Sequence, residues 1–175
     1  MKNRALLFAF SLLLLAACSP DREKMVADIE EHEAAMSMLD VSVDEDKAQE
    51  MIGLYRHFVN EFPDDSLAPV YMMRVADISI TLGETEQAVN VLDSIINIYP
   101  GFEDVPFCLF QKGYAYEASE QYDKARQCYQ QFVDEYPDHY MAADTRKMLP
   151  YIGMSPEEMF EAIMNNATDQ NLTMQ

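Results

Sequence analysis

Residues 129–137 read YQQFVDEYP, and stretches of the same design occur three times in the chain. The other two are YRHFVNEFP at residues 55–63 and LDSIINIYP at residues 92–100. Each stretch ends on a proline, and successive prolines are 37 residues apart. A fixed period of this length is typical of solenoids, in which one supersecondary unit stacks on the next. The sequence therefore predicts an array of repeated units.

The units are expected to be helical. Glycine is scarce, and unbranched side chains, which lose little rotamer freedom in a helix, are abundant. Apolar residues recur at three- and four-residue steps between residues 22 and 165. We predict an all-α fold over this range, a short right-handed solenoid of helical hairpins with about seven to eight helices. The polar residues 166–175 are predicted to form a disordered tail.

Helix ends can be placed from local signals. Ser42 and Glu45 have the spacing of a capping box before a helix that ends near Phe62. Gly83 suits the left-handed position after a helix, and Pro150 should stop a helix that begins at Tyr140. A last helix opens with a capping box over residues 155–158. Its apolar residues Met159, Phe160 and Ile163 are expected to cover the exposed end of the stack.

The chain is strongly acidic, with a formal net charge of −19. Such a surface repels phosphate backbones, so nucleic acid and bare anionic membrane are poor partners. The simpler explanation of the acidity is that it keeps the protein soluble. The alternative is that it forms an acidic docking face.

The N-terminus has the features of an export signal. Lys2 and Arg4 precede an apolar run over residues 5–15, which as a helix would rise about 16 Å, too little to span a bilayer. The run ends Leu15-Ala16-Ala17-Cys18, which resembles the lipobox of bacterial lipoproteins. The resemblance implies a signal peptide over residues 1–17 and a lipidated Cys18 with a tether over residues 18–21. It favours the outer membrane without indicating which face. The alternative is an ordinary secretory signal with an incidental cysteine.

The repeats resemble the tetratricopeptide repeat. Small residues stand where the two helices of a repeat approach closely, and aromatic residues and prolines stand where the family pattern has them. These signature positions are Ala76, Ala88, Pro100, Gly113, Tyr116, Ala125, Tyr129 and Pro137. Full repeats are expected at about residues 64–100 and 101–137. The family period is 34 residues, and the three extra ones here are expected to lengthen the first helix of each repeat. Longer repeats of this kind resemble envelope tetratricopeptide lipoproteins of the BamD and Tol–Pal-associated type.

Catalytic chemistry has little support. The segment from His32 to Met36 begins like a zinc-protease helix but lacks the second histidine. His57 and His139 are expected to be surface or packing residues, and we predict no catalytic residue, no metal and no cofactor. Cys108 and Cys128 are either buried thiols or, in an exported protein, a disulfide.

The resemblance implies a binding face on the first helix of each repeat. The corresponding positions are Val70, Met73, Asp77, Ile80, Phe107, Phe110, Tyr114 and Glu117, with Lys147 in a partial third repeat. An apolar and acidic face suits an extended or helical peptide, including a basic one. Alternatively, Phe107 and Phe110 are core residues. We therefore expect a protein-binding scaffold on the envelope. Its alternatives are an accessory of outer-membrane protein assembly and a surface lipoprotein that binds a small molecule or glycan.

Overall fold

The computed structural model describes residues 21–37 and 44–173, and within these ranges every regular element is a helix. The chain divides into two compact units, residues 1–71 and 72–175. The elements are α2 (Arg22–Ser37), α3 (Glu45–Glu61), α4 (Leu67–Thr81), α5 (Thr85–Ile98), α6 (Val105–Ala118), α7 (Tyr122–Glu135), α8 (Ala142–Met148), the 3₁₀ helix η2 (Leu149–Tyr151) and α9 (Pro156–Thr173). The predicted all-α fold is confirmed for the described residues.

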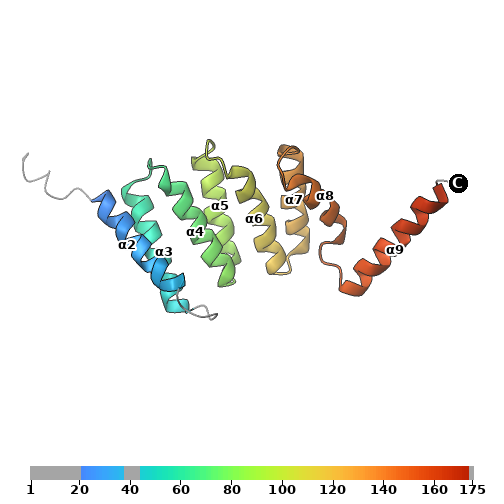
Figure 1. Cartoon of the computed structure of the whole chain (residues 1–175), viewed down its shortest axis with the longest axis horizontal. Coiled ribbons are helices and arrows are strands. Elements are labelled where there is room, and N and C mark those ends of the chain that lie inside the picture. The colour runs from blue at the N-terminus through green and yellow to red at the C-terminus, as the bar shows by residue number, and fades with distance from the viewer. Residues whose placement is uncertain (1–20, 38–43, 174–175) are drawn as a thin grey trace, which may run out of the picture. The chain divides into compact units, whose positions relative to one another are not determined.

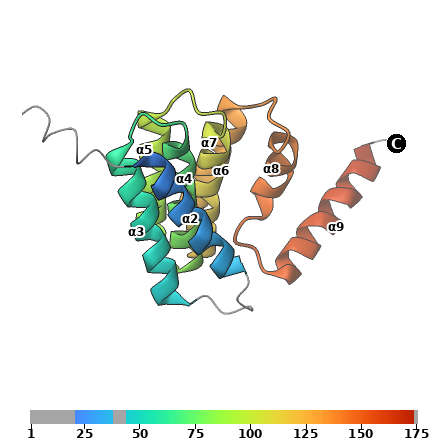
Figure 2. The same ribbon diagram turned by 60° about the vertical axis from the view of Figure 1, so that its left-hand side comes forward.

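The first unit is a pair of helices, α2 and α3, which lie side by side in Figure 2. Helix α3 buries Ala48, Met51, Tyr55 and Phe58, as its apolar stripe predicts. Its N-cap is Asp44, whose carboxylate accepts the backbone N–H of Lys47 at 3.3 Å. The predicted capping box therefore starts at the wrong residue, and Ser42 lies outside the described residues.

Arg22 connects parts of the first unit through an ion pair and a contact with an aromatic ring. Its guanidinium donates two hydrogen bonds to the Asp65 carboxylate and lies 5.9 Å from the ring centroid of Phe58. The Tyr71 ring meets Phe58 edge-on at 4.8 Å and stacks on Tyr55 at 5.2 Å. These contacts join α2 and α3 to Asp65, just before α4, and to Tyr71 in α4.

The repeated aromatic–proline pair acts as a helix stop. Phe62, Tyr99 and Tyr136 are C-caps, with φ between −131° and −119° and ψ between 57° and 61°. The following proline explains this geometry, because its ring disfavours the helical conformation for the residue before it. The backbone N–H of each aromatic residue still donates to the carbonyl four residues earlier. Each second helix of a hairpin therefore ends in the same way.

The same turn follows each of these stops. The carbonyls of Phe62, Tyr99 and Tyr136 accept the N–H of the residue three positions on, at 2.9–3.1 Å. Helices α4 and α6 then begin at Leu67 and Val105. The prediction that the three extra residues of each repeat lengthen these helices is wrong, because the residues after each proline form hydrogen-bonded turns.

The second unit contains two helical hairpins, most of α4 with α5, and α6 with α7, which follow one another in chain order (Figure 1). Both trailing helices bury one stripe at helical spacing. In α5 it comprises Ala88, Leu92 and Ile95, and in α7 it comprises Ala125, Tyr129 and Phe132. The apolar period of the sequence thus corresponds to the core of this unit.

The two hairpins turn through the same left-handed position. Gly83 has φ 75° and Glu120, 37 residues later, has φ 60°. In both turns the residue after this position donates its backbone N–H to the carbonyl oxygen five residues earlier. Glu84 donates to Ser79 and Gln121 donates to Tyr116, each over 2.8 Å. This is the Schellman pattern, which needs one residue with positive φ. Gly83 adopts it without steric cost, whereas the Cβ of Glu120 makes it unfavourable.

Replacing Glu120 by glycine is therefore expected to stabilise the folded protein by about 0.5–1 kcal/mol. Urea unfolding followed by circular dichroism measures the change. Gly83→Ala is the reciprocal variant and should cost about 1 kcal/mol. If the Glu120→Gly protein is less stable than the parent, the backbone of Glu120 is not strained in this turn.

The chain beyond α7 closes the unit with a short segment. Helix α8 begins two residues later than predicted and gives way to η2 around Pro150. Ile152 is buried against Ala125 and Tyr129, and its carbonyl accepts an N–H of Arg126 at 3.0 Å. The α8–η2 segment, rather than α9, therefore covers the end of the α6–α7 hairpin.

The predicted capping box of α9 is present. Ser155 donates its N–H to the Glu158 carboxylate at 2.7 Å, and Glu158 donates its N–H to the Ser155 hydroxyl at 3.2 Å. However, the apolar side chains of Met159, Phe160 and Ile163 stay exposed, Phe160 at 65%. The expectation that they cover the end of the stack is not met. The helix also extends past residue 165 to Thr173. No helix among the described residues is long and apolar enough to cross a bilayer.

Candidate binding face

Helices α4 and α6 lead the two hairpins and carry all eight residues predicted to bind a partner, seven of them in the second unit. These seven are Met73, Asp77, Ile80, Phe107, Phe110, Tyr114 and Glu117, which we call the leading-helix face. Val70, the eighth, is half-buried and belongs to the first unit. Lys147, on α8, is exposed and donates to Asp144 at 2.8 Å.

The apolar members of this face are partly core residues. Phe110 contacts the buried rings of Tyr129 and Phe132, with centroids 5.0 and 5.7 Å away, and Phe107 stacks on Phe110 at 6.3 Å. Met73 and Ile80 pack against two separate buried clusters of the unit. These four half-buried side chains therefore combine a packing role with a surface that remains partly accessible.

Tyr114 is the most accessible aromatic side chain of the face, with 52% of its area exposed. One turn along α6, Glu117 accepts a hydrogen bond from the Tyr129 hydroxyl at 2.8 Å. Burial raises the pKa of Tyr129, and the hydrogen bond to Glu117 acts in the same direction. Tyr129 thus stays a neutral donor that orients the Glu117 carboxylate beside Tyr114.

Asp77 forms the second polar feature of the face. It is half-buried, and it accepts a short hydrogen bond from the side-chain Nε2 of Gln111 on α6. Burial raises the pKa of Asp77, while the hydrogen bond from Gln111 lowers it. Gln111 is only 7% exposed, and its Oε1 is the buried side-chain atom without a hydrogen-bond partner among the described residues. The pair therefore holds one buried acceptor, the Gln111 Oε1, that no donor among the described residues satisfies.

Sequence reasoning missed Gln111. A signal was present, because Gln111 falls in the buried stripe of α6 between Cys108 and Ala115, at steps of three and four residues. A polar side chain in such a stripe needs a partner, since an unsatisfied polar group is costly to bury. What the spacing does not reveal is that the partner is Asp77, 34 residues earlier.

The signature residues position the two leading helices. Ala76, Ala88, Gly113, Ala125 and Tyr129 are all buried. A Cβ on Gly113 would lie 2.7 Å from the ring of Tyr129, so this position requires glycine. Of the remaining signature residues, Tyr116 is half-buried, and Pro100 and Pro137 are exposed beside the helix stops.

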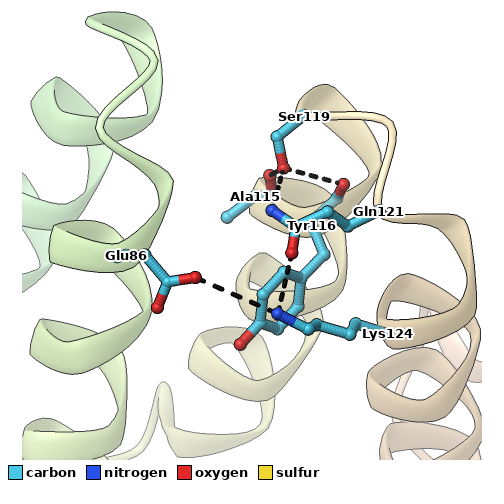
Figure 3. Close-up of polar contacts among 6 residues, drawn as sticks. All are labelled: Glu86, Ala115, Tyr116, Ser119, Gln121 and Lys124. Carbon is cyan, nitrogen blue, oxygen red and sulfur yellow. Dashed lines mark hydrogen bonds and ion pairs between the residues drawn. The ribbon is translucent and has the colours of Figure 1, made fainter.

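A polar network links α5 to the turn between α6 and α7 (Figure 3). Lys124 Nζ lies 3.9 Å from a Glu86 carboxylate oxygen, 2.8 Å from Gln121 Oε1 and 4.9 Å from the ring centroid of Tyr116. The Ser119 hydroxyl donates to the carbonyls of Ala115 and Tyr116 and accepts from Gln121. Because these groups satisfy one another, the network serves to connect the repeats.

Among the described residues, Cys108 and Cys128 are buried free thiols, as in the first of the two alternatives. Cys108 packs with Ala76, Leu92 and Ile95, and burial raises the pKa of its thiol to about 12. Burial also raises the pKa of Cys128. Among residues 21–37 and 44–173, no group of three or more His, Cys, Asp or Glu side chains is arranged to hold a metal ion.

The observed hairpins place this chain in the class of all-helical repeat proteins. Two consecutive stretches, residues 71–101 and 107–139, match the tetratricopeptide repeat family model. They coincide with α4–α5 and α6–α7, so the helices stand in a tetratricopeptide-like arrangement. Tetratricopeptide domains are in general non-catalytic and bind protein partners. No curated protein matches the sequence.

Proposed function

We propose that the chain is a lipid-anchored scaffold of the bacterial cell envelope that binds a peptide or protein partner on its leading-helix face. The two matched repeats support the scaffold role, since repeats of this family bind proteins. The lipobox resemblance at Cys18, outside the described residues, supports a tether to the outer membrane. The tether leaves the repeats on either the periplasmic or the outer surface.

The observation that carries the binding role is the exposure of Tyr114 on a face that also carries two carboxylates. About half of the Tyr114 side chain is exposed, and the acidic residues of the face are Asp77 on α4 and Glu117, one turn along α6. Tyrosine is enriched in binding hot spots because it offers a large rigid apolar area and a hydroxyl with little entropy to lose. A peptide with an apolar anchor and basic flanks would meet complementary groups here.

Crosslinking in living cells followed by mass spectrometry tests this proposal. Tyr114→Ala is expected to lower the yield of the captured partner about tenfold or more, the effect of losing one hot-spot residue. The matched control is Tyr140→Ala, because Tyr140 is 82% exposed and lies outside the leading-helix face.

The two variants separate the outcomes. Loss of the partner in the Tyr114→Ala protein alone supports the proposal, and capture of a β-barrel assembly factor would specify an assembly role. Equal capture by the parent and both variants would refute binding at this face. A thermal shift with sugars but no captured protein would favour the glycan-binding alternative.

A further inference from the structure

We propose that Asp77 and Gln111 form a subsite that accepts the guanidinium group of an arginine in the bound peptide. The inference rests on the proposed function, because it names the chemistry that the leading-helix face selects. It concerns one hydrogen-bonded pair, which joins α4 to α6 across the boundary between the two repeats.

The first argument is the unsatisfied acceptor. Gln111 is more than nine-tenths buried, and its Nε2 is engaged with Asp77, which fixes the direction of the amide group. Its Oε1 has no donor among the described residues. A buried carbonyl oxygen normally has a hydrogen-bond partner, so this atom calls for an N–H or O–H group that the described residues do not supply.

The second argument is the charge of Asp77. A carboxylate offers about four acceptor sites, and Gln111 fills one of them. Burial disfavours the charged form of Asp77, whereas a cation alongside would favour it. Arg74, one turn earlier on α4, lowers the pKa of Asp77 but forms no ion pair with it in the described structure. The site is therefore a half-buried carboxylate whose charged form a cationic partner would stabilise.

The third argument selects guanidinium over ammonium. Guanidinium carries five N–H donors in one plane, so a single group can donate both to a carboxylate and to a neighbouring amide oxygen. Its flat face also stacks on aromatic rings, and the exposed ring of Tyr114 lies one turn from Gln111 on α6. The ammonium group of lysine is a compact charge that lacks this planar fork. The net charge of −19 attracts every basic peptide, whether its cations are arginine or lysine. The Asp77–Gln111 pair is what would favour arginine over lysine.

Selection of random twelve-residue peptides displayed on phage against the full chain tests the inference. Peptides that bind are expected to share one arginine position. Synthetic versions with lysine or with neutral citrulline at this position should bind more weakly, citrulline by about tenfold or more, as expected for losing a charge-assisted hydrogen bond. Fluorescence polarisation with the labelled peptides measures the affinities.

Variants of the protein test whether the Asp77–Gln111 pair causes the preference for arginine. Asp77→Asn keeps an acceptor for Gln111 and the size of the side chain, so this variant should fold, which its circular dichroism melting curve verifies. It is expected to lose the arginine preference and to bind the arginine and citrulline peptides equally. Asp134→Asn removes the same charge from an exposed site on α7 and should keep the preference.

The results that would overturn the arginine subsite differ from the result that would also overturn the proposed function. Peptides that depend on Tyr114 but share no basic position would overturn the arginine subsite and leave the proposed function standing. An arginine preference that survives Asp77→Asn would also overturn the subsite. Failure of every peptide to depend on Tyr114 would overturn both.

Discussion

Replacing Cys18 by serine is expected to move the protein from the membrane fraction of the cells to the soluble fraction. The cysteine thiol is the group that the lipobox pattern marks for acylation, and serine has no thiol. Each methylene of a buried acyl chain contributes about 0.8 kcal/mol to membrane affinity, so loss of the chains abolishes anchoring.

Cell fractionation and metabolic labelling with an alkyne fatty acid measure this effect. The parent should carry the label and sediment with membranes, whereas the Cys18→Ser protein should do neither. Ser19→Ala changes the adjacent residue without touching the thiol and should behave as the parent does. A parent chain that is exported, unlabelled and soluble would instead identify residues 1–17 as an ordinary secretory signal.

Gly113→Ala is expected to destabilise the second unit by about 2 kcal/mol, the cost of overpacking a filled core. The added Cβ would lie 2.7 Å from two ring carbons of Tyr129. That ring is 1% exposed, and the hydrogen bond of its hydroxyl to Glu117 opposes its displacement. The usual gain in helix propensity from glycine to alanine, about 1 kcal/mol, is too small to offset such a contact.

Thermal unfolding followed by circular dichroism measures the change, and a loss of about 2 kcal/mol lowers the melting temperature by roughly 4–8 °C in a chain of this size. Gly101→Ala is the matched control, because a Cβ there has no neighbour within 4 Å. It makes the same chemical change in the same unit and should be neutral or slightly stabilising. Equal destabilisation by both substitutions would rule out the contact with Tyr129 as the cause.

Much of this fold can be predicted because its determinants are local. The aromatic–proline pairs stop helices through the steric demand of proline on one neighbouring residue, and the same C-cap geometry follows at Phe62, Tyr99 and Tyr136. The capping box at Ser155 is equally local. Neither signal depends on which segments meet in space, so reading the sequence suffices.

Other features depend on contacts between distant residues and escape such a reading. The bond between Gln111 and Asp77 joins adjacent repeats, and no local pattern pairs them. The apolar residues of α9 have a helical stripe typical of a packed helix, yet Phe160 stays exposed and Ile152 takes the predicted covering role. An amphipathic pattern shows which face of a helix can be buried, but it does not identify the surface that buries it.

The burial of the two thiols makes the protein convenient to label. Alkylating dyes react with thiolates, and Cys108, with a pKa of about 12 and no exposed area, supplies essentially none at neutral pH. Cys128 is shielded in the same way. A cysteine introduced by Tyr140→Cys, at a site 82% exposed, would then be the one reactive thiol of the described residues. A dye at that position can report on the repeats without removal of Cys108 or Cys128.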